Sequence, residues 1–132
     1  MYEIKPRMSV DGIPFGATAL SLTTRGYVED VTGYDAITHW RTFKNNSDVE
    51  VYVKDDVVVC MACFSRCVLD GEDLIGRSPS DIECILGLPD EVGEVIWVSE
   101  DRQQTPHEYF SLGLQVWFES DRVVAVFCND LY

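Results

Sequence analysis

The sequence lacks a long apolar run, an excess of positive charge and a glycine-rich loop that could cradle phosphates. Its longest apolar stretches fall well short of the roughly 20 residues that a membrane-spanning helix needs. Its 10 Lys and Arg are outnumbered by 23 Asp and Glu, and such a surface repels nucleic-acid phosphates and anionic lipids. We therefore expect neither a nucleic acid nor a membrane as the partner.

Catalytic motifs are also missing from the sequence. No G-x-S-x-G is present, and the two histidines, His39 and His107, stand in no known catalytic pattern. The adjacent acids Asp55–Asp56 would diverge on a strand or turn, so they make a poor acid–base pair. We expect a protein that is not an enzyme and needs no cofactor, although a hydrolase that uses Cys63 or Cys67 with His39 stays open as an alternative.

The cysteines predict free thiols. Their number is odd, and the first residues lack the apolar stretch of a secretory signal, so we expect a reducing compartment, the cytoplasm. Cys60 and Cys63 form a C-x-x-C pattern, which invites a zinc or redox interpretation. The surrounding valines indicate a buried strand, on which residues three apart point to opposite faces. We therefore predict no metal site.

The negative charge is distributed unevenly along the chain. Residues 1–66 contain nine acidic and seven basic residues, a net charge of −2. Residues 67–132 contain fourteen acidic and three basic residues, a net charge of −11. Solubility does not require such an asymmetry, whereas a field that attracts a basic partner does.

We predict one domain made of two approximate repeats, residues 11–69 and 70–132. Each copy has an Asp-Gly turn, a helix, a tryptophan-bearing segment, and an alternating strand that ends in a charged turn and a valine run. The small residues recur in pairs: Asp11-Gly12 with Asp70-Gly71, Gly16 with Gly76, and Gly26 with Gly87. The expected fold class is α+β, an antiparallel sheet with short helices packed on one face.

The helix of the second copy has the clearer sequence signals. Ser78 is typical of an N-cap, Pro79 of the first helical position and Gly87 of a helix end. In the first copy, residues 17–25 predict a shorter helix with Leu20 pointing into the core.

Two strands indicate which face of the sheet is open. Residues 49–54 and 114–119 alternate between apolar side chains and a polar set with one aromatic at its centre, Tyr52 or Trp117. Tryptophan is usually mostly buried, so either ring could instead cap a small loop-covered core. The matching positions favour an open aromatic face.

The tryptophan segments extend the same pattern. Trp40, in residues 37–43, and Trp97, in residues 95–99, are equivalent in the repeat, so we place both on the face opposite the helices. Acidic residues rim this face. We therefore predict a partner-binding set of seven residues: Trp40, Tyr52, Trp97, Glu100, Asp101, Trp117 and Glu119.

The second copy carries a family resemblance. Residues 74–82 (LIGRSPSDI), 86–90 (LGLPD) and 114–126, with Tyr109 between them, are similar to repeats of beta-lactamase inhibitory protein and of small outer-membrane-assembly lipoproteins. They also resemble small acidic immunity proteins, which neutralise toxins in bacterial competition. The chain lacks the lipoprotein's signal and lipid-bearing cysteine, and the cysteine placement of the secreted inhibitor. The resemblance therefore favours an immunity protein, and it implies a protein-binding function on the open face or its edge loops.

These observations lead to a functional hypothesis. We expect a cytoplasmic, non-enzymatic inhibitor of a basic toxin, such as a nuclease that must grip nucleic acid. Acidic residues would speed the encounter, and central aromatic rings would slow dissociation. The alternative is a small-ligand-binding or accessory domain that uses the aromatic face as a pocket.

Overall fold

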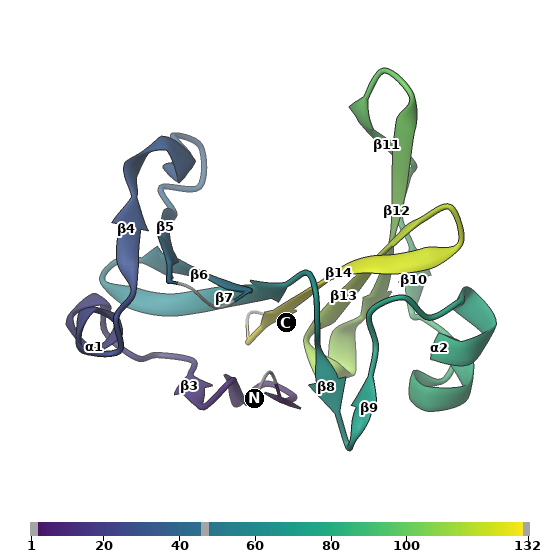
Figure 1. Ribbon diagram of the computed structural model, residues 1–132, viewed down its shortest axis with the longest axis horizontal. Coiled ribbons are helices and arrows are strands. Elements are labelled where there is room, and N and C mark those ends of the chain that lie inside the picture. The colour runs from purple at the N-terminus through teal and green to yellow at the C-terminus, as the bar shows by residue number, and fades with distance from the viewer. Residues whose placement is uncertain (1–2, 46–47, 131–132) are drawn as a thin grey trace.

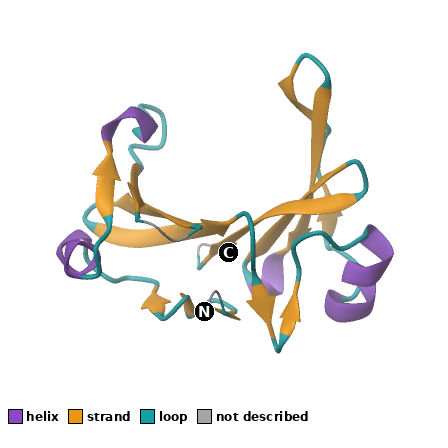
Figure 2. Cartoon of the chain, in the orientation of Figure 1, coloured by secondary structure: helices purple, strands orange, loops and turns teal. Residues whose placement is uncertain are grey.

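The computed structural model describes residues 3–45 and 48–130, and a large antiparallel sheet dominates it (Figures 1 and 2). The strands of this sheet are β4 (Val28–Asp30), β5 (Arg41–Lys44), β6 (Val49–Lys54), β7 (Val57–Cys63), β10 (Glu91–Val92), β11 (Ile96–Ser99), β12 (Arg102–Tyr109), β13 (Leu114–Glu119) and β14 (Arg122–Asn129). Within the described residues, eight of the nine strands follow the order β10-β12-β13-β14-β7-β6-β5-β4, and the ninth, β11, pairs with β12.

The remaining elements are short. They are β1 (Ile4–Lys5), β2 (Ser9–Val10), β3 (Ile13–Pro14), β8 (Val68–Leu69), β9 (Glu72–Asp73), α1 (Ala19–Thr24), α2 (Pro79–Leu86) and the 3-10 turns η1 (Val31–Gly33) and η2 (Phe110–Leu112). The fold is thus mostly antiparallel sheet with a few short helices, as the sequence predicts at this coarse level. Within the described residues, no helix has the length and apolar character that crossing a membrane requires.

The helix boundaries follow the capping residues. The hydroxyl of Ser78 accepts a hydrogen bond from the backbone N–H of Asp81 at 3.2 Å, and α2 ends at Gly87, whose φ of 84° suits glycine. The prediction that Leu20 points into the core was wrong, because its side chain is 73% exposed. α1 begins at Ala19, and residues three apart share a helix face, so Ala19 and Leu22 are the buried pair.

Both helices pack on the same face of the sheet. Leu22 of α1 and Ile82 of α2 belong to one buried cluster with Val51 of β6 and Val116 of β13. The alternation predicted for β6 and β13 is confirmed, since Val49, Val51 and Val53 are buried, as are Leu114, Val116 and Phe118. Within the described residues, neither α-helix lies on the opposite face of the sheet (Figure 1).

Two hairpins, β6–β7 and β13–β14, form the middle of the sheet and meet where β7 pairs with β14. Each hairpin has a register shift directly after its central aromatic, between Tyr52 and Val53 and between Trp117 and Phe118. Each turn has two residues with positive φ, Asp55–Asp56 in the first and Ser120–Asp121 in the second. The two hairpins therefore hold Tyr52 and Trp117 at corresponding places.

Two arms project from the helix-free side of the sheet (Figure 1). One is the β11–β12 hairpin, and the other is the segment β4–η1–β5. In the second arm, the predicted tryptophan segment of residues 37–43 is not one continuous strand. The carboxylate of Asp35 accepts hydrogen bonds from the N–H groups of Ile37 and Thr38, and His39 has a φ of 61°, so a turn precedes β5. Trp40 consequently lies just before β5 rather than within a strand.

The prediction of five free thiols was also wrong. Cys63, at the end of β7, forms a disulfide with Cys67, and Cys60, Cys84 and Cys128 are free. Disulfides persist mainly in oxidising compartments. The cytoplasmic placement stays a prediction, and the free-thiol argument no longer supports it.

Candidate protein-binding surface

A row of aromatic rings crosses the helix-free face of the sheet. Its members, which we call the aromatic row, are Trp40, Tyr52, Phe127 and Trp117. Their ring centroids are 5.9 Å apart for Trp40 and Tyr52, 6.1 Å for Tyr52 and Phe127, and 6.3 Å for Phe127 and Trp117. The rings come from the start of β5, from β6, from β14 and from β13. The row thus joins both halves of the sheet.

Small side chains beneath the row allow the rings to meet. Ala62 of β7 lies directly opposite Phe127, and Cys60 lies directly opposite Tyr52. Both small residues are buried, at 0% and 4% exposure, whereas the rings above them are only partly covered. The row is therefore a layer of aromatic surface on the sheet rather than part of the core.

Hydrogen bonds fix the orientation of two polar rings of the row, Tyr52 and Trp117. The Tyr52 hydroxyl donates to the Glu50 carboxylate at 2.7 Å, and Trp117 Nε1 donates to the Gln115 side-chain oxygen, also at 2.7 Å. In both cases the acceptor lies two residues earlier on the same strand and the same face. A ring held in this way loses little conformational freedom when a partner packs on it.

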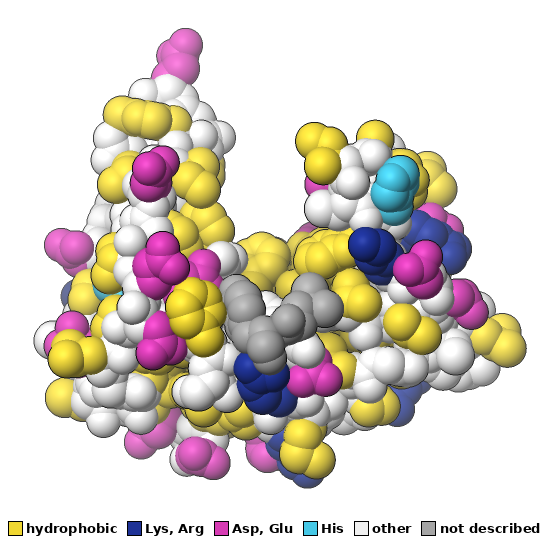
Figure 3. All heavy atoms as spheres, turned by 180° about the vertical axis from the view of Figure 1, so that it is seen from behind, with side chains coloured by type: hydrophobic (Ala, Val, Ile, Leu, Met, Phe, Trp, Pro, Cys, Tyr) yellow, Lys and Arg dark blue, Asp and Glu magenta, His cyan; other side chains and the backbone are white. Residues whose placement is uncertain are grey.

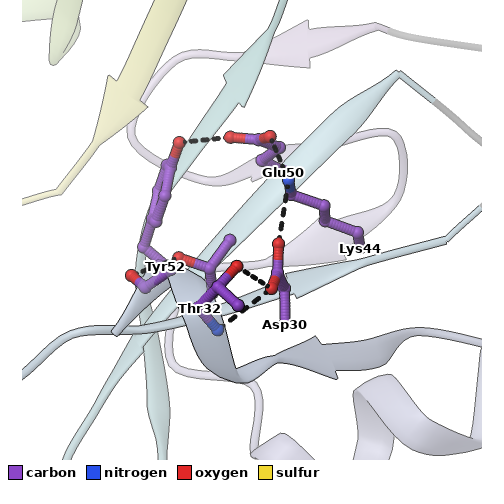
Figure 4. A network of polar contacts seen from close by, with 7 residues as sticks. Asp30, Thr32, Lys44, Glu50 and Tyr52 are labelled. Atoms are coloured by element: carbon purple, nitrogen blue, oxygen red, sulfur yellow. Dashed lines mark hydrogen bonds and ion pairs between the residues drawn. The ribbon is translucent and has the colours of Figure 1, made fainter. Parts of the chain in front are cut away.

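A polar network extends from Tyr52 into the neighbouring arm (Figure 4). Glu50 also pairs with Lys44 at 3.2 Å, and Lys44 pairs with Asp30 at 3.1 Å. Burial, followed by the hydrogen bond to Glu50, raises the pKa of Tyr52 far above its ordinary value, so the phenol stays neutral. The network ties β4, β5 and β6 together and anchors one end of the aromatic row.

An apolar pocket opens beside the other end of the row. It has a volume of about 380 Å³, and its apolar lining includes Phe64, Ile96, Val98, Trp117 and Phe127. Figure 3 shows that the molecule is hollowed between the two arms and that hydrophobic side chains lie on the floor of this cleft. The row and the pocket together form one continuous apolar surface within the cleft.

Glu119 contacts two residues that line this pocket, Arg102 and Gln104, so its charge is already paired. Arg102 Nη2 lies 2.8 Å from Glu119 Oε1, and Gln104 donates to the same oxygen at 3.0 Å. The hydrogen bond from Arg102 lowers the pKa of Glu119 below its ordinary value. The sequence predicts Glu119 as a partner-binding residue on the rim, and the structure shows that it already forms an ion pair with Arg102.

Glu100 and Asp101 form the tip of the hairpin arm, where both are exposed. Asp101 accepts a hydrogen bond from the Ser99 hydroxyl at 3.0 Å. Acidic side chains gather on this arm and at its base, whereas the other arm carries both signs of charge (Figure 3). The negative field is therefore oriented toward one side of the cleft.

The prediction that Trp97 lies with the other rings was wrong. Trp97 lines a separate cavity of about 440 Å³ with Pro79, at the start of α2, and with the core residue Phe118. Its neighbours Ile96 and Val98 face the apolar pocket instead. Adjacent residues of a strand point to opposite faces, so only one of the two sets can face the cleft.

The error has a clear origin in the assumed equivalence of two tryptophans. Trp97 lies within β11, which pairs with β12, whereas Trp40 lies one residue before β5. The two tryptophans therefore occupy different positions relative to the strands of their own half of the chain. The structure brings Trp40, Tyr52 and Trp117 together and leaves Trp97 outside the group.

Four contributors to the surface were absent from the predicted set: Phe64, Ile96, Val98 and Phe127. Phe127 pairs with Gln115, a residue already assigned to the open face, so correct strand pairing would have identified it. The apolar run before Phe127 obscures the alternation of β14. Phe64 directly follows β7 and is fixed by its N–H, which donates to the Asp48 carboxylate at 2.6 Å.

The two histidines and the cysteines of the hydrolase alternative each have a contact of their own in the structure. His107 packs against Phe118, with ring centroids 4.5 Å apart, and burial lowers its pKa. His39 hydrogen bonds to the hydroxyl of Tyr34 at 2.9 Å. Cys63 and Cys67 share a disulfide, so in this oxidised form neither sulfur is a free nucleophile. No group of three or more possible metal ligands occurs within residues 3–45 and 48–130.

Comparisons with protein-family models, with curated proteins and with solved structures each find no match to this chain. Function must therefore be argued from the surface itself.

Proposed function

We propose that this protein is a non-enzymatic inhibitor that holds a basic protein in the cleft between its two arms. In the most specific form of the proposal it is an immunity protein, and its partner is a cationic toxin that acts on nucleic acid. The observation that carries the proposal is the aromatic row, a set of fixed, partly exposed rings at the centre of a cleft.

The aromatic row has the makeup of a binding hot spot. Tryptophan and tyrosine near the centre of an interface often contribute most of the binding free energy. Trp117 and Tyr52 are held by hydrogen bonds to Gln115 and Glu50. Binding a partner therefore costs these two side chains little conformational entropy. The arms on either side would exclude water from the contact, which strengthens polar interactions at its rim.

The charge distribution supports a basic partner. Several cations of the chain already pair with carboxylates: Arg7, Arg41, Lys44, Arg77 and Arg102. Glu94, just before β11, and Glu100, at the tip of the β11–β12 hairpin, form no ion pair with another described residue. Their field would attract a cationic protein over roughly a Debye length of about 8–10 Å and speed its association.

The two-repeat organisation, residues 11–69 and 70–132 of one domain, is part of the proposal. Its support is a set of matching backbone contacts. Gly16 donates to the Val58 carbonyl at 3.0 Å, and Gly76 donates to the Val123 carbonyl at 2.9 Å. Glycines at corresponding places thus join the start of each half to the second strand of its central hairpin, β7 or β14, as expected of two copies of one unit.

A small-ligand-binding domain is the second candidate, and the apolar pocket favours it. A volume of about 380 Å³ is within the range of small-molecule sites, and Arg102 and Gln104 add polar groups at its edge. Salt distinguishes the two candidates. Association with a basic protein slows as ionic strength rises, whereas the affinity of a neutral ligand hardly changes.

The experiment uses a purified basic nuclease, or the product of a neighbouring gene where that product is basic, as the candidate partner. Its association rate and its activity are measured with and without this protein, at about 50 mM and about 300 mM salt. We expect inhibition at stoichiometric amounts and a several-fold slower association at high salt. Trp117→Ala should abolish most of the inhibition, whereas Leu20→Ala, on the exposed side of α1, should leave it intact. A tight complex without inhibition, or equal loss in both variants, would refute the proposal.

A further inference from the structure

The strand β11 has an unusual surface for the edge of a sheet. It pairs with β12 on one side, and no other strand within the described residues pairs with its outer side. All four of its residues are exposed, and its apolar members Ile96, Trp97 and Val98 have exposures of 46%, 61% and 46%. Proteins usually protect such an edge with charge, proline or a covering segment, because its free backbone groups invite another strand.

Both faces of β11 are apolar. Ile96 and Val98 face the pocket beside the aromatic row, and Trp97 faces the cavity with Pro79 on the helix side. A strand added at the outer edge would therefore find apolar surface for its own side chains on either face. Figure 1 shows β11 on the arm that projects from the sheet, where an added strand can approach it.

Acidic residues flank this edge and determine what can pair with it. Glu94 lies just before β11, and Glu100 and Asp101 lie just after it. An antiparallel pair of two copies of this strand, centred on Trp97, would place Glu94 opposite Glu100 at both ends. Like charges directly opposite each other destabilise a strand pair, so a second copy of the chain is a poor occupant. An extended segment with Lys or Arg at its ends is complementary.

We propose that the outer edge of β11 accepts an extended segment of the basic partner by strand addition. The segment's backbone hydrogen bonds to β11, its central apolar side chains pack on Ile96 and Val98 or on Trp97, and its basic ends pair with Glu94 and Glu100. The inference rests on the proposed function, because strand addition would be one way in which this protein binds the same basic partner.

The test uses a synthetic peptide as the probe and NMR of the isotope-labelled full chain. The peptide is acetyl-Lys-Val-Thr-Val-Thr-Val-Lys-amide. A matched ester analogue, in which esters replace the central amides, keeps every side chain but lacks the N–H donors. A second analogue has Glu in place of Lys. We expect the basic peptide to shift the amide resonances of β11, and both analogues to bind at least about tenfold more weakly.

Charge exchange supplies the second arm of the test. The double variant Glu94→Lys/Glu100→Lys should prefer the Glu-ended peptide to the Lys-ended one. Glu83→Lys, on the exposed side of α2, changes charge away from β11 and should keep the original preference. Absence of binding, equal binding of the ester analogue, or shifts confined to the aromatic row would each overturn the inference.

The outcomes separate this inference from the proposed function. If this protein inhibits the basic protein but the peptide does not bind β11, strand addition is refuted and the inhibitor role stands. Peptide binding at β11 without inhibition of any basic protein would remove the inhibitor role instead.

Discussion

Tyr52 and Phe127 stack across the centre of the sheet, with ring centroids 6.1 Å apart and planes inclined by 11°. The rings belong to different hairpins, because Tyr52 lies on β6 and Phe127 on β14. They meet above β7, where Ala62 is fully buried. This contact makes the aromatic row continuous, and it depends on a small residue at position 62.

Ala62→Leu should disrupt the row. The added atoms have no free volume beneath the rings, so the variant must displace Phe127 or strain β7, at a cost of about 1–3 kcal/mol in the free energy of unfolding. Urea unfolding of the variant measures this cost, and near-ultraviolet circular dichroism reports the altered ring packing. A variant with unchanged stability and spectrum would show that the small residue is not needed.

Trp117→Ala should weaken partner binding far more than it weakens the fold. Removing a central anchor costs on the order of 2–4 kcal/mol of binding free energy, about 30-fold to 800-fold in Kd. The indole is only partly buried above a core that Val116 and Phe118 already fill, so stability should fall by only about 1 kcal/mol. Calorimetric titration and thermal melting measure the two effects. Equal losses in both would show that Trp117 belongs to the core.

Neutralising Glu100 and Asp101 together should slow association and leave dissociation nearly unchanged. The two carboxylates are exposed at the tip of an arm, so they contribute through long-range attraction. Stopped-flow measurements of Glu100→Gln/Asp101→Asn at low and high salt should show that the variant and the native protein converge as salt rises. A change confined to the dissociation rate would contradict this steering role.

The ion pair between Glu119 and Arg102 should make stability depend on pH. The hydrogen bond from Arg102 lowers the pKa of Glu119 below its ordinary value of 4.5. A lowered folded-state pKa stabilises the fold above the unfolded-state pKa, and this stabilisation is lost as pH falls through the folded-state pKa. Glu119→Gln should therefore be less stable than the native protein near neutral pH, and the gap should close on acidification. Glu100→Gln serves as the control, and a gap that stays constant between about pH 3 and pH 7 would contradict the prediction.

The cysteines should differ sharply in reactivity. Cys84 is exposed, whereas Cys60 and Cys128 are buried, and burial raises the pKa of Cys60 to about 12. A thiol alkylating reagent should modify Cys84 alone in the folded protein, three cysteines after unfolding, and all five only after reduction as well. Intact-mass spectrometry counts the modified thiols. Five modified thiols in the unfolded, unreduced protein would contradict the disulfide.

Local signals in the sequence predicted much of the fold. Ser78 and Gly87 mark the ends of α2 because capping is a property of a few adjacent residues. The period of two in β13 gave the buried face of that strand correctly, and with it the position of Trp117. Such features need no knowledge of which strands are neighbours.

The errors lie where long-range pairing decides. Trp97 was assigned to the wrong face because its strand is exposed on both sides, so the side-chain pattern does not reveal the core. Phe127 was missed because its role depends on β14 lying between β7 and β13. A strand order of this kind is fixed by contacts far apart in the chain, and one sequence gives little information about it.

Oxidative footprinting of the complex with the basic partner tests the central claim most directly. It compares the solvent reactivity of side chains on the two faces of the sheet. We predict that Trp40, Trp117 and Phe127 lose most of their reactivity in the complex, while the exposed Leu20 and Leu88 on the helix side keep theirs. Protection of Leu20 and Leu88 with unchanged reactivity of Trp117 would place the partner on the opposite face and contradict the account.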